Sequence, residues 1–529
     1  MEPEKVGAAL LVLALAFILI ELPHLESGLP LHSDEYDNTA TAKRSLEEGR
    51  LYFGDPYAPP AGSAYSPGEQ LDFESGYIAI MAAMALLVGY LNLHLIVPFL
   101  VFLFVLFSAF LLVKKLCGHE FVAFCAVLFL FFLPSYQNTL GPVFLVASNL
   151  GLALFALLLL FGFEYLHERR SAKKLLATGI GAVLIYPPSL ALAAISLLGA
   201  IIFSPQLVQK NKRELLISGG LLALTSVMYI LVGLFFSGLD VIGFLQSDAP
   251  GFFGALGSYV LDVLVFRKTV ALGIPNLYDY IGLPLFALGI ASIAYFGQKT
   301  HRLEENQAFF IPAAVVSVIA ILGVFWGAAP FVFPERYLLF AGFLLLLCAG
   351  ALAGEILLKA QNLLAQTGTG KKYAKIAALA QIFFVLLVGG IAVASNSFDA
   401  QSAQLNVQES ELEGIAWLSQ NTQKASLVFA APYMSKPIYV LADRAVFCTT
   451  ATRFGCPKEL VALASSFFFA SCEDREKILS DYFRADYVLL QKELDASGGK
   501  IFFPQTECGF LEKVYEGTNI IIYKTKSLN

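Results

Sequence analysis

The amino-acid sequence predicts a polytopic α-helical membrane protein with a small α/β domain at its C-terminal end. Long apolar runs recur along the chain, several of them near the ~20 residues that span a bilayer. Only 14% of the residues are charged, against roughly 25% in an average soluble domain. Charged residues become dense only after about residue 400. We therefore expect a membrane domain over residues 1–396 and an extracytoplasmic domain over residues 397–529.

Eleven apolar runs are expected to cross the membrane as helices. They cover residues 6–22, 95–113, 121–133, 143–165, 175–185, 190–203, 215–236, 281–296, 308–326, 337–358 and 376–394. The first run could also be a signal peptide, but Glu21–His24 offers no small-residue cleavage site, so we expect an uncleaved helix. Tyr186-Pro187-Pro188 separates two short runs, which we expect to form a helix pair that turns at a membrane surface.

Basic residues in five connections predict the orientation, because cytoplasmic loops carry an excess of Lys and Arg. These connections contain Lys114 and Lys115; Arg169, Arg170, Lys173 and Lys174; Lys210, Lys212 and Arg213; Lys299 and Arg302; and Lys371, Lys372 and Lys375. All five clusters fall on the cytoplasmic side if the apolar run 77–91 does not cross the membrane. We therefore expect this run to form a juxtamembrane helix in the first outer loop, residues 25–94. The N-terminus is then cytoplasmic, and the first outer loop and the C-terminal domain lie outside.

Helix and strand patterns alternate beyond residue 400, which is typical of a small α/β domain. Residues 411–418 have the apolar spacing of a helix, and residues 426–431, 487–490 and 520–523 have the composition of buried strands. The net charge of −6 gives no reason to expect a nucleic-acid partner.

Four cysteines fall in the C-terminal domain: Cys448, Cys456, Cys472 and Cys508. An even number in an oxidising compartment favours two disulfides, with the pairing left open. Free thiols and a zinc site are the alternatives, but no Cys-x-x-Cys spacing supports zinc.

The first outer loop contains an acidic segment that we single out as a candidate site. Asp34, Glu35 and Asp37 follow the first apolar run, in a stretch expected to form a short amphipathic helix ending at Gly49. A carboxylate at a membrane surface can act as general base on an acceptor hydroxyl, or hold a divalent metal ion. The alternative is that Asp34 and Asp37 cap the helix or face water.

This segment resembles the GT-C superfamily of membrane glycosyltransferases: a first helix, an outer Asp-Glu, then Tyr36, an Ala, Lys43-Arg44, Leu46 and Gly49. The superfamily includes protein O-mannosyltransferases, aminoarabinose transferases and oligosaccharyltransferase catalytic subunits. The layout of the whole chain is similar as well, and residues 510–524 look like the terminal hairpin of such proteins.

The resemblance implies transfer of a sugar from a polyprenyl- or dolichyl-phosphate carrier to a glycan, lipid or protein acceptor on the extracytoplasmic face. It also implies that Asp34 is catalytic, with Glu35 beside it. Two features depart from the oligosaccharyltransferase pattern: Pro134–Thr139 contains no carboxylate, and Trp417 stands without a Trp-Trp-Asp-Tyr-Gly signature. We therefore expect a single-sugar transferase with a carboxylate base, and whether a divalent metal ion takes part stays open.

A phosphate-linked donor needs cations on the outer side, where basic residues are few. Arg336 lies at the outer end of a predicted helix, and Arg267 and Lys268 lie in the outer stretch 238–280. Each could give a phosphate charge-assisted hydrogen bonds. The alternatives are an ion pair with Glu335 or an interfacial anchor for Arg336, and attraction to lipid headgroups for the other two.

A different class of function is also open: a transporter or flippase of lipid-linked sugars, or a non-catalytic membrane scaffold. Transporters often have internal symmetry and helices broken at the midplane. We find no internal repeat, and the acidic segment lies in a loop, which favours the enzyme.

The orientation can be tested by thiol labelling. Pro60→Cys and Gln420→Cys, each in a background without free native cysteines, should both react with an impermeant maleimide in intact cells, because residues 32–75 and 400–529 are expected on the same outer face. Labelling of position 60 without labelling of position 420 would contradict this topology.

Overall fold

The computed structural model describes residues 3–52, 56–57, 75–135, 141–168, 170–203, 267–268, 277–299, 307–326, 328–329, 334–366, 387, 391, 407, 409–447, 458–496, 499–502 and 508–526. The predicted span 215–236 lies outside these residues, as does the span 376–394 apart from Leu387 and Ile391. The chain forms two compact units, each described here by itself.

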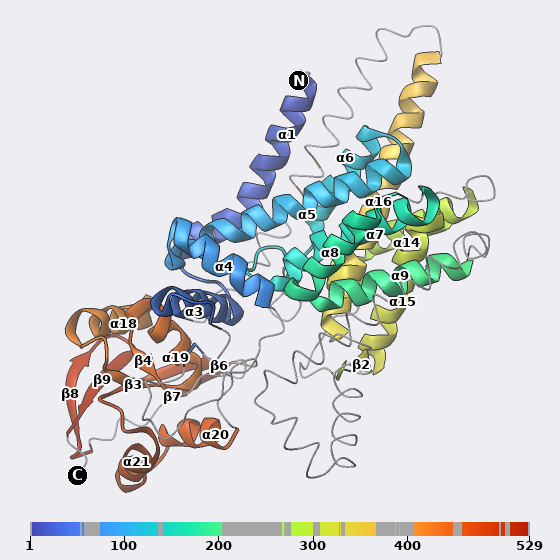
Figure 1. Cartoon of the computed structure of the whole chain (residues 1–529). Coiled ribbons are helices and arrows are strands. Elements are labelled where there is room, and N and C mark those ends of the chain that lie inside the picture. Colours follow the sequence, from blue (N-terminus) through green and yellow to red (C-terminus); the bar gives the residue numbers. More distant parts are fainter. Residues whose placement is uncertain are drawn as a thin grey trace, which may run out of the picture. The chain divides into compact units, whose positions relative to one another are not determined.

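The first unit is a bundle of apolar helices (Figure 1). Its helices are α1 (Pro3–Ala16), the turn η1 (Phe17–Glu21), α2 (Leu22–Ser27), α5 (Leu93–Cys117), α6 (Glu120–Phe129), η3 (Leu130–Phe132), α7 (Ala147–Glu168), α8 (Ala172–Ile185), α9 (Pro187–Phe203), α13 (Leu277–Ile281), α14 (Leu283–Lys299), α15 (Gln307–Trp326) and α16 (Pro334–Gln366). Two short strands, β1 (Arg267–Lys268) and β2 (Ala328–Ala329), pair antiparallel in the same unit.

Helix α16 is buried throughout residues 337–352 and packs against α6, α14 and α15. Gly350 and Gly354 allow its close approach to α6: a Cβ at Gly350 would lie 2.6 Å from the Cα of Ala126, and one at Gly354 would lie 2.9 Å from the Cα of Val122. Small residues at a spacing of four let helix backbones approach in a membrane, where helices associate through packing.

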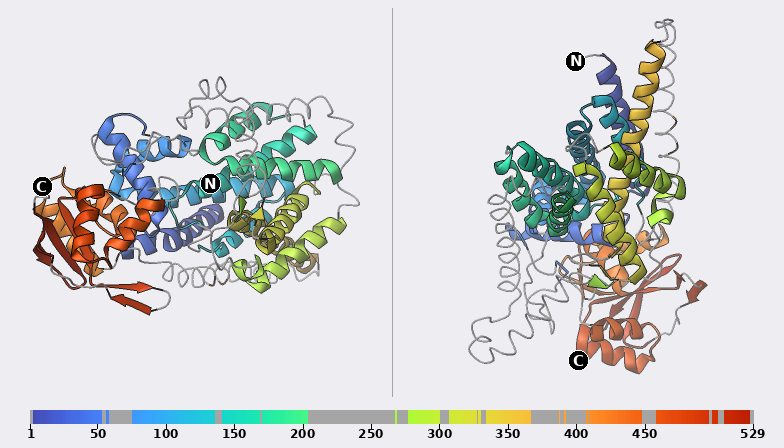
Figure 2. Two further views of the ribbon diagram at one scale, coloured as in Figure 1. Left: turned by 90° about the horizontal axis from the view of Figure 1, so that it is seen from below. Right: turned by 90° about the vertical axis from the view of Figure 1, so that its right-hand side faces the viewer.

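The break predicted at Tyr186-Pro187-Pro188 separates α8 from α9, and both helices pack against α7 (Figure 2). Gly151 of α7 faces Tyr186, and the Ser189 hydroxyl donates to the Gly151 carbonyl at 2.9 Å. The turn between the two short helices is therefore held against α7.

Four helices within the described residues are long and apolar enough to cross a membrane. They cover Ala9–Ser27, Tyr90–Cys117, Ala147–Leu166 and Arg336–Leu363. Shorter apolar helices occupy Gly76–Val88, Glu120–Phe132, Pro187–Leu198, Leu283–Phe296 and Pro312–Gly323. The predicted number of eleven crossings is not confirmed by these helices.

The second unit joins the C-terminal domain to helices of Leu29–His94, which belong to the predicted first outer loop. The loop provides α3 (Ser33–Glu48), α4 (Ser75–Val88) and η2 (Tyr90–Asn92). The C-terminal elements are α18 (Glu409–Asn421), β3 (Leu427–Phe429), α19 (Pro432–Pro437), η6 (Ile438–Ala442), β4 (Ala445–Val446), α20 (Lys458–Phe467), α21 (Cys472–Ile478), η7 (Leu479–Phe483), β5 (Tyr487–Gln491), β6 (Glu493–Ala496), β7 (Gly499–Phe502), β8 (Leu511–Glu516) and β9 (Ile520–Thr525).

A five-stranded mixed sheet forms the centre of this unit, in the order β4-β3-β5-β9-β8. Strand β3 is parallel to β4 and β5, whereas β9 is antiparallel to β5 and β8. The predicted helix 411–418 is α18, and the three predicted strands are β3, β5 and β9. The closing segment forms the expected hairpin, with a bulge between Lys513 and Tyr515.

Aromatic and aliphatic side chains fill the space between this sheet and its helices. The Phe429 ring of β3 lies 4.7 Å from the Phe467 ring and 4.8 Å from the Phe483 ring, measured between centroids. Tyr36 and Ala40, four residues apart on α3, belong to the same buried cluster. Helix α3 lies beside α19 (Figure 1) and is thus part of the core of the C-terminal domain.

Cys472 at the start of α21 is joined by a disulfide to Cys508, three residues before β8. Cys448 and Cys456 lie outside the described residues, so a second disulfide between them stays a prediction. Among the described residues, Cys117, Cys125 and Cys348 of the first unit take part in no disulfide.

The disulfide closes a loop over a sequence separation of 36 residues. Its removal in C472S/C508S should lower the free energy of unfolding of the C-terminal domain by about 2–4 kcal/mol, because the unfolded chain gains conformational freedom. Urea-dependent pulse proteolysis of the full chain measures this loss. Peptide mapping that finds both cysteines alkylated without prior reduction would contradict the bond.

Candidate active site

Helix α3 begins with a capping box built from His32 and Glu35. The Nδ1 atom of His32, the N-cap residue, accepts a hydrogen bond from the Asp34 N–H at 3.1 Å. The Glu35 carboxylate accepts from the His32 N–H at 3.1 Å and from the Leu31 N–H. These bonds satisfy donors that a helix start otherwise leaves unpaired. His32 replaces the usual Ser or Thr, and the His-x-x-Glu spacing is the sequence signal for the cap.

Glu35 is fully buried, because its carboxylate lies against these backbone donors. Through its hydrogen bonds with the Leu31 and His32 N–H groups, Glu35 fixes the first turn of α3. A direct catalytic role for Glu35 stays a prediction.

Asp34 is the second residue of α3, and its environment differs from that of Glu35. Its side chain is 34% exposed, and its Oδ1 atom lies 3.8 Å from His32 Nδ1. The first turn of a helix is a favourable position for a carboxylate, because the unpaired N–H groups carry partial positive charge. The structure thus places Asp34 at a capped helix start with its side chain partly exposed.

Asp37, one turn further along α3, neither caps the helix nor faces water. Asp37 and Lys436 of α19 form an ion pair at 2.9 Å, and both side chains are 4% exposed. The Tyr57 hydroxyl donates to the other Asp37 oxygen at 2.7 Å. The alternative that Asp37 is a cap or a solvated residue is therefore wrong.

Lys43, two turns after Asp37, forms a second ion pair with the C-terminal domain. Its ammonium group pairs with Asp443, donates to the Tyr439 carbonyl at 2.9 Å and lies 4.1 Å from the centroid of the Tyr439 ring. Burial would raise the pKa of Asp443, but hydrogen bonds from Lys424 and Lys43 hold that pKa below its ordinary value. The Asp443 carboxylate is therefore ionised at neutral pH and neutralises the buried Lys43.

Sequence analysis did not identify Lys436 or Asp443. The only local signal is Lys436 itself, a single cation within the otherwise apolar or small residues of 428–442. Breaking a buried pair by removing one partner typically costs about 3–5 kcal/mol, because the other charge is left uncompensated. The two pairs therefore fix α3 to the C-terminal domain far more strictly than exposed ion pairs would.

The candidate donor-binding residues lie in the first unit. Arg336 is the third residue of α16 and is half-buried. Strand β1, formed by Arg267 and Lys268, pairs with β2, in the connection that leads from α15 to α16. The backbone pairing thus brings the segment of Arg267 and Lys268 to the connection that precedes Arg336.

No group of three or more His, Cys, Asp or Glu side chains suited to a metal ion occurs among the residues that the structure describes. We therefore assign no metal ligands.

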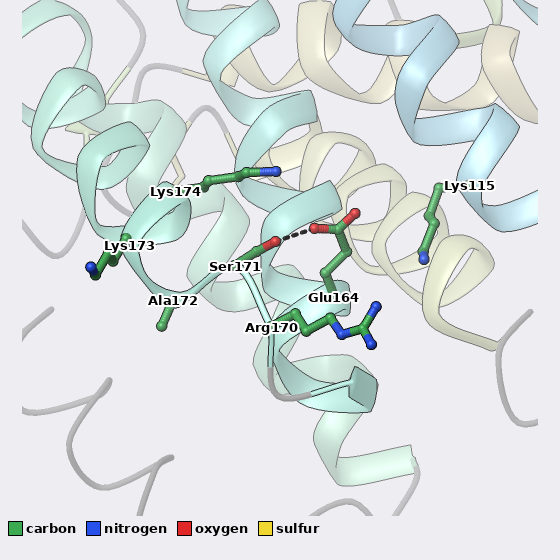
Figure 3. A pocket seen from close by; sticks show the side chains of 7 residues that line it. All are labelled: Lys115, Glu164, Arg170, Ser171, Ala172, Lys173 and Lys174. Atoms are coloured by element: carbon green, nitrogen blue, oxygen red, sulfur yellow. Dashed lines mark hydrogen bonds between the residues drawn. The ribbon is translucent and has the colours of Figure 1, made fainter.

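A basic hollow of about 600 Å³ lies elsewhere in the first unit, between the C-terminal end of α5 and the connection from α7 to α8 (Figure 3). It is lined by Lys115, Glu164, Arg170, Ser171, Ala172, Lys173 and Lys174. The Ser171 hydroxyl donates to the Glu164 carboxylate (Figure 3). Two of the predicted cytoplasmic clusters therefore lie together, which supports their assignment to one side of the membrane.

Solved structures share the fold of this chain. One is the archaeal oligosaccharyltransferase AglB from Archaeoglobus fulgidus, in complex with an inhibitory peptide and a dolichol-phosphate. It is 15% identical, with a TM-score of 0.56 over 93% of this chain and 70% of that chain. Another is ArnT from Cupriavidus metallidurans bound to undecaprenyl phosphate. It is 11% identical, with a TM-score of 0.59 over 99% of this chain and 98% of that chain.

A further structure of the Archaeoglobus fulgidus oligosaccharyltransferase, in complex with Zn and sulfate, is 14% identical to this chain. Its TM-score is 0.53 over 92% of this chain and 68% of that chain. No protein-family model and no curated protein matches the sequence. The predicted resemblance to GT-C glycosyltransferases is confirmed as a resemblance of fold, because AglB and ArnT are both GT-C enzymes.

Proposed function

We propose that this protein is a membrane glycosyltransferase that moves a sugar from a polyprenyl-phosphate carrier to an acceptor on the extracytoplasmic face. The observation that carries the proposal is the position of Asp34 within a GT-C fold. Of the three acidic residues at the start of α3, Glu35 and Asp37 are buried against fixed partners, whereas the Asp34 side chain is partly exposed. The fold matches two proteins whose structures hold dolichol-phosphate and undecaprenyl phosphate.

In the proposed reaction, Asp34 accepts the proton of an acceptor hydroxyl as that oxygen attacks the anomeric carbon of the sugar. The bond between this carbon and the phosphate oxygen breaks, and its electron pair leaves with the polyprenyl phosphate. Attack from the face opposite the leaving group inverts the anomeric configuration. A sugar hydroxyl is a weak nucleophile, so a positioned base is required at this step.

Arg336 is proposed to bind the donor phosphate and to stabilise the negative charge of the leaving group. Its guanidinium can form paired, charge-assisted hydrogen bonds with phosphate oxygens. The start of α16 adds the partial positive charge of a helix N-terminus. Arg267 and Lys268 are proposed as additional donor-binding residues, because β1 pairs with the connection that precedes α16.

No step of this proposal passes through a metal ion, although one structure of a neighbour in fold contains Zn. In the proposed reaction, Asp34 supplies the base and Arg336 supplies the positive charge that binds the phosphate. The C-terminal domain is proposed to lie outside the cytoplasm, as the basic connections predict.

Asp34→Asn should lower sugar transfer by about 10²–10⁴-fold, because Asn cannot accept the proton. The assay uses a radiolabelled polyprenyl-phosphate hexose in proteoliposomes that contain membrane extract of the source cells as acceptor pool. Asn retains the size and capping ability of Asp, so folding and donor binding should persist. Glu47→Gln, an exposed acid of the same helix, is the matched control and should transfer normally. Wild-type turnover by a folded Asp34→Asn protein would contradict the catalytic role of Asp34.

Arg336→Ala should weaken donor binding more than it slows the bound complex, because the lost contact exists before the reaction begins. Single-turnover kinetics over a range of donor concentrations separate the two effects. Lys173→Ala, a cation of the basic hollow, serves as control and should bind the donor normally. An unchanged donor affinity in Arg336→Ala would exclude Arg336 as the phosphate-binding residue.

A further inference from the structure

The side of α3 that carries Tyr36 and Ala40 packs in the core of the C-terminal domain and lies away from Asp34, whereas Asp37, which pairs with Lys436 of that domain, lies about 60° from Asp34. Tyr36 and Ala40 belong to the buried core of that domain. At 3.6 residues per turn, Asp34 lies about 120° around the helix from Ala40. This apolar packing leaves the Asp34 side chain 34% exposed.

The two ion pairs between α3 and the domain are reciprocal. Helix α3 contributes the anion Asp37 and the cation Lys43, and the domain contributes the cation Lys436 and the anion Asp443. If α3 ran in the opposite direction, each charge would face one of its own sign. The charge pattern therefore selects one direction and one register for α3, in addition to its apolar packing.

The pair between Asp37 and Lys436 lies one helical turn from Asp34, because residues three apart are neighbours on a helix surface. The capping box fixes Asp34 relative to the helix, through the bond from the Asp34 N–H to His32. The buried pair then fixes the helix relative to the domain. Asp34 is thereby positioned through two successive rigid connections.

We propose that the C-terminal domain positions the catalytic helix, with Lys436 and Lys43 as positioning residues that act through Asp34. This inference rests on the proposed function, since it assigns Asp34 to the reaction. A misplacement of about 1 Å at a catalytic group can lower a rate by about 10²-fold, so losing Lys436 should be visible in kcat.

The test compares Lys436→Met with Lys436→Arg, which keeps the charge, and with Lys477→Met. Lys477 is an exposed lysine on α21 of the same domain. In the full chain, Lys436→Met should lower kcat by about 100-fold and leave the donor KM within about threefold of wild type. Lys436→Arg should retain most of the activity, and Lys477→Met should behave as wild type. Lys43→Gln removes the second ion pair, between Lys43 and Asp443, and should lower kcat less than Lys436→Met does.

Hydrogen exchange of the same proteins reports the position of α3 directly. In Lys436→Met the amides of residues 36–48 should exchange faster, while those of β5 and β9 stay protected and show that the domain is folded. In the Asp34→Asn background, Lys436→Met should cause no further loss of the residual transfer, because it acts through Asp34.

Three results would overturn the inference: unchanged exchange of α3 in Lys436→Met, wild-type kcat despite faster exchange, or an equal loss of rate with and without Asp34. If Asp34 is not the catalytic base, the Asp34→Asn variant alone keeps full activity. This result distinguishes failure of the proposed function from failure of the inference about Lys436. The exchange data would still show whether the domain holds α3.

Discussion

The ion pair between Asp37 and Lys436 is the interaction on which the arrangement of the second unit depends. Both side chains are almost completely buried, although they come from positions 399 residues apart. A buried charge without a partner would destabilise the fold, so each residue of the pair compensates the charge of the other. As a consequence, helix α3 belongs to the core of the C-terminal domain. The same constraint applies to the first unit, where helices long and apolar enough to cross a membrane exclude charge from long stretches.

Three neighbouring carboxylates on α3 have three different tasks because their surroundings differ. Glu35 satisfies backbone donors at the helix start, and Asp37 binds Lys436 and Tyr57. Asp34 has the exposure that a proton acceptor needs. Rigid supports around an accessible reacting group are a general feature of catalytic sites, since precise placement lowers the cost of reaching the transition state.

The sequence predicted those parts of the fold that depend on local patterns. Gly49 ends α3 in the left-handed conformation, with a φ of 64°, as the glycine after an amphipathic stretch suggests. Strands β5 and β9 were predictable from their runs of branched and aromatic residues. Strand β4 has only two residues, and the β6–β7 hairpin is polar enough to leave no clear alternation. The pairing of Asp37 with Lys436 was beyond prediction, because no local pattern connects residues so distant in the chain.

The most direct test of this account is native mass spectrometry of the purified full chain supplied with a polyprenyl-phosphate hexose. The account predicts one bound donor per chain on both the wild type and Asp34→Asn. Addition of the acceptor pool should convert the donor to polyprenyl phosphate on the wild type alone. Absence of any bound polyprenyl phosphate species, or equal conversion by both proteins, would contradict it.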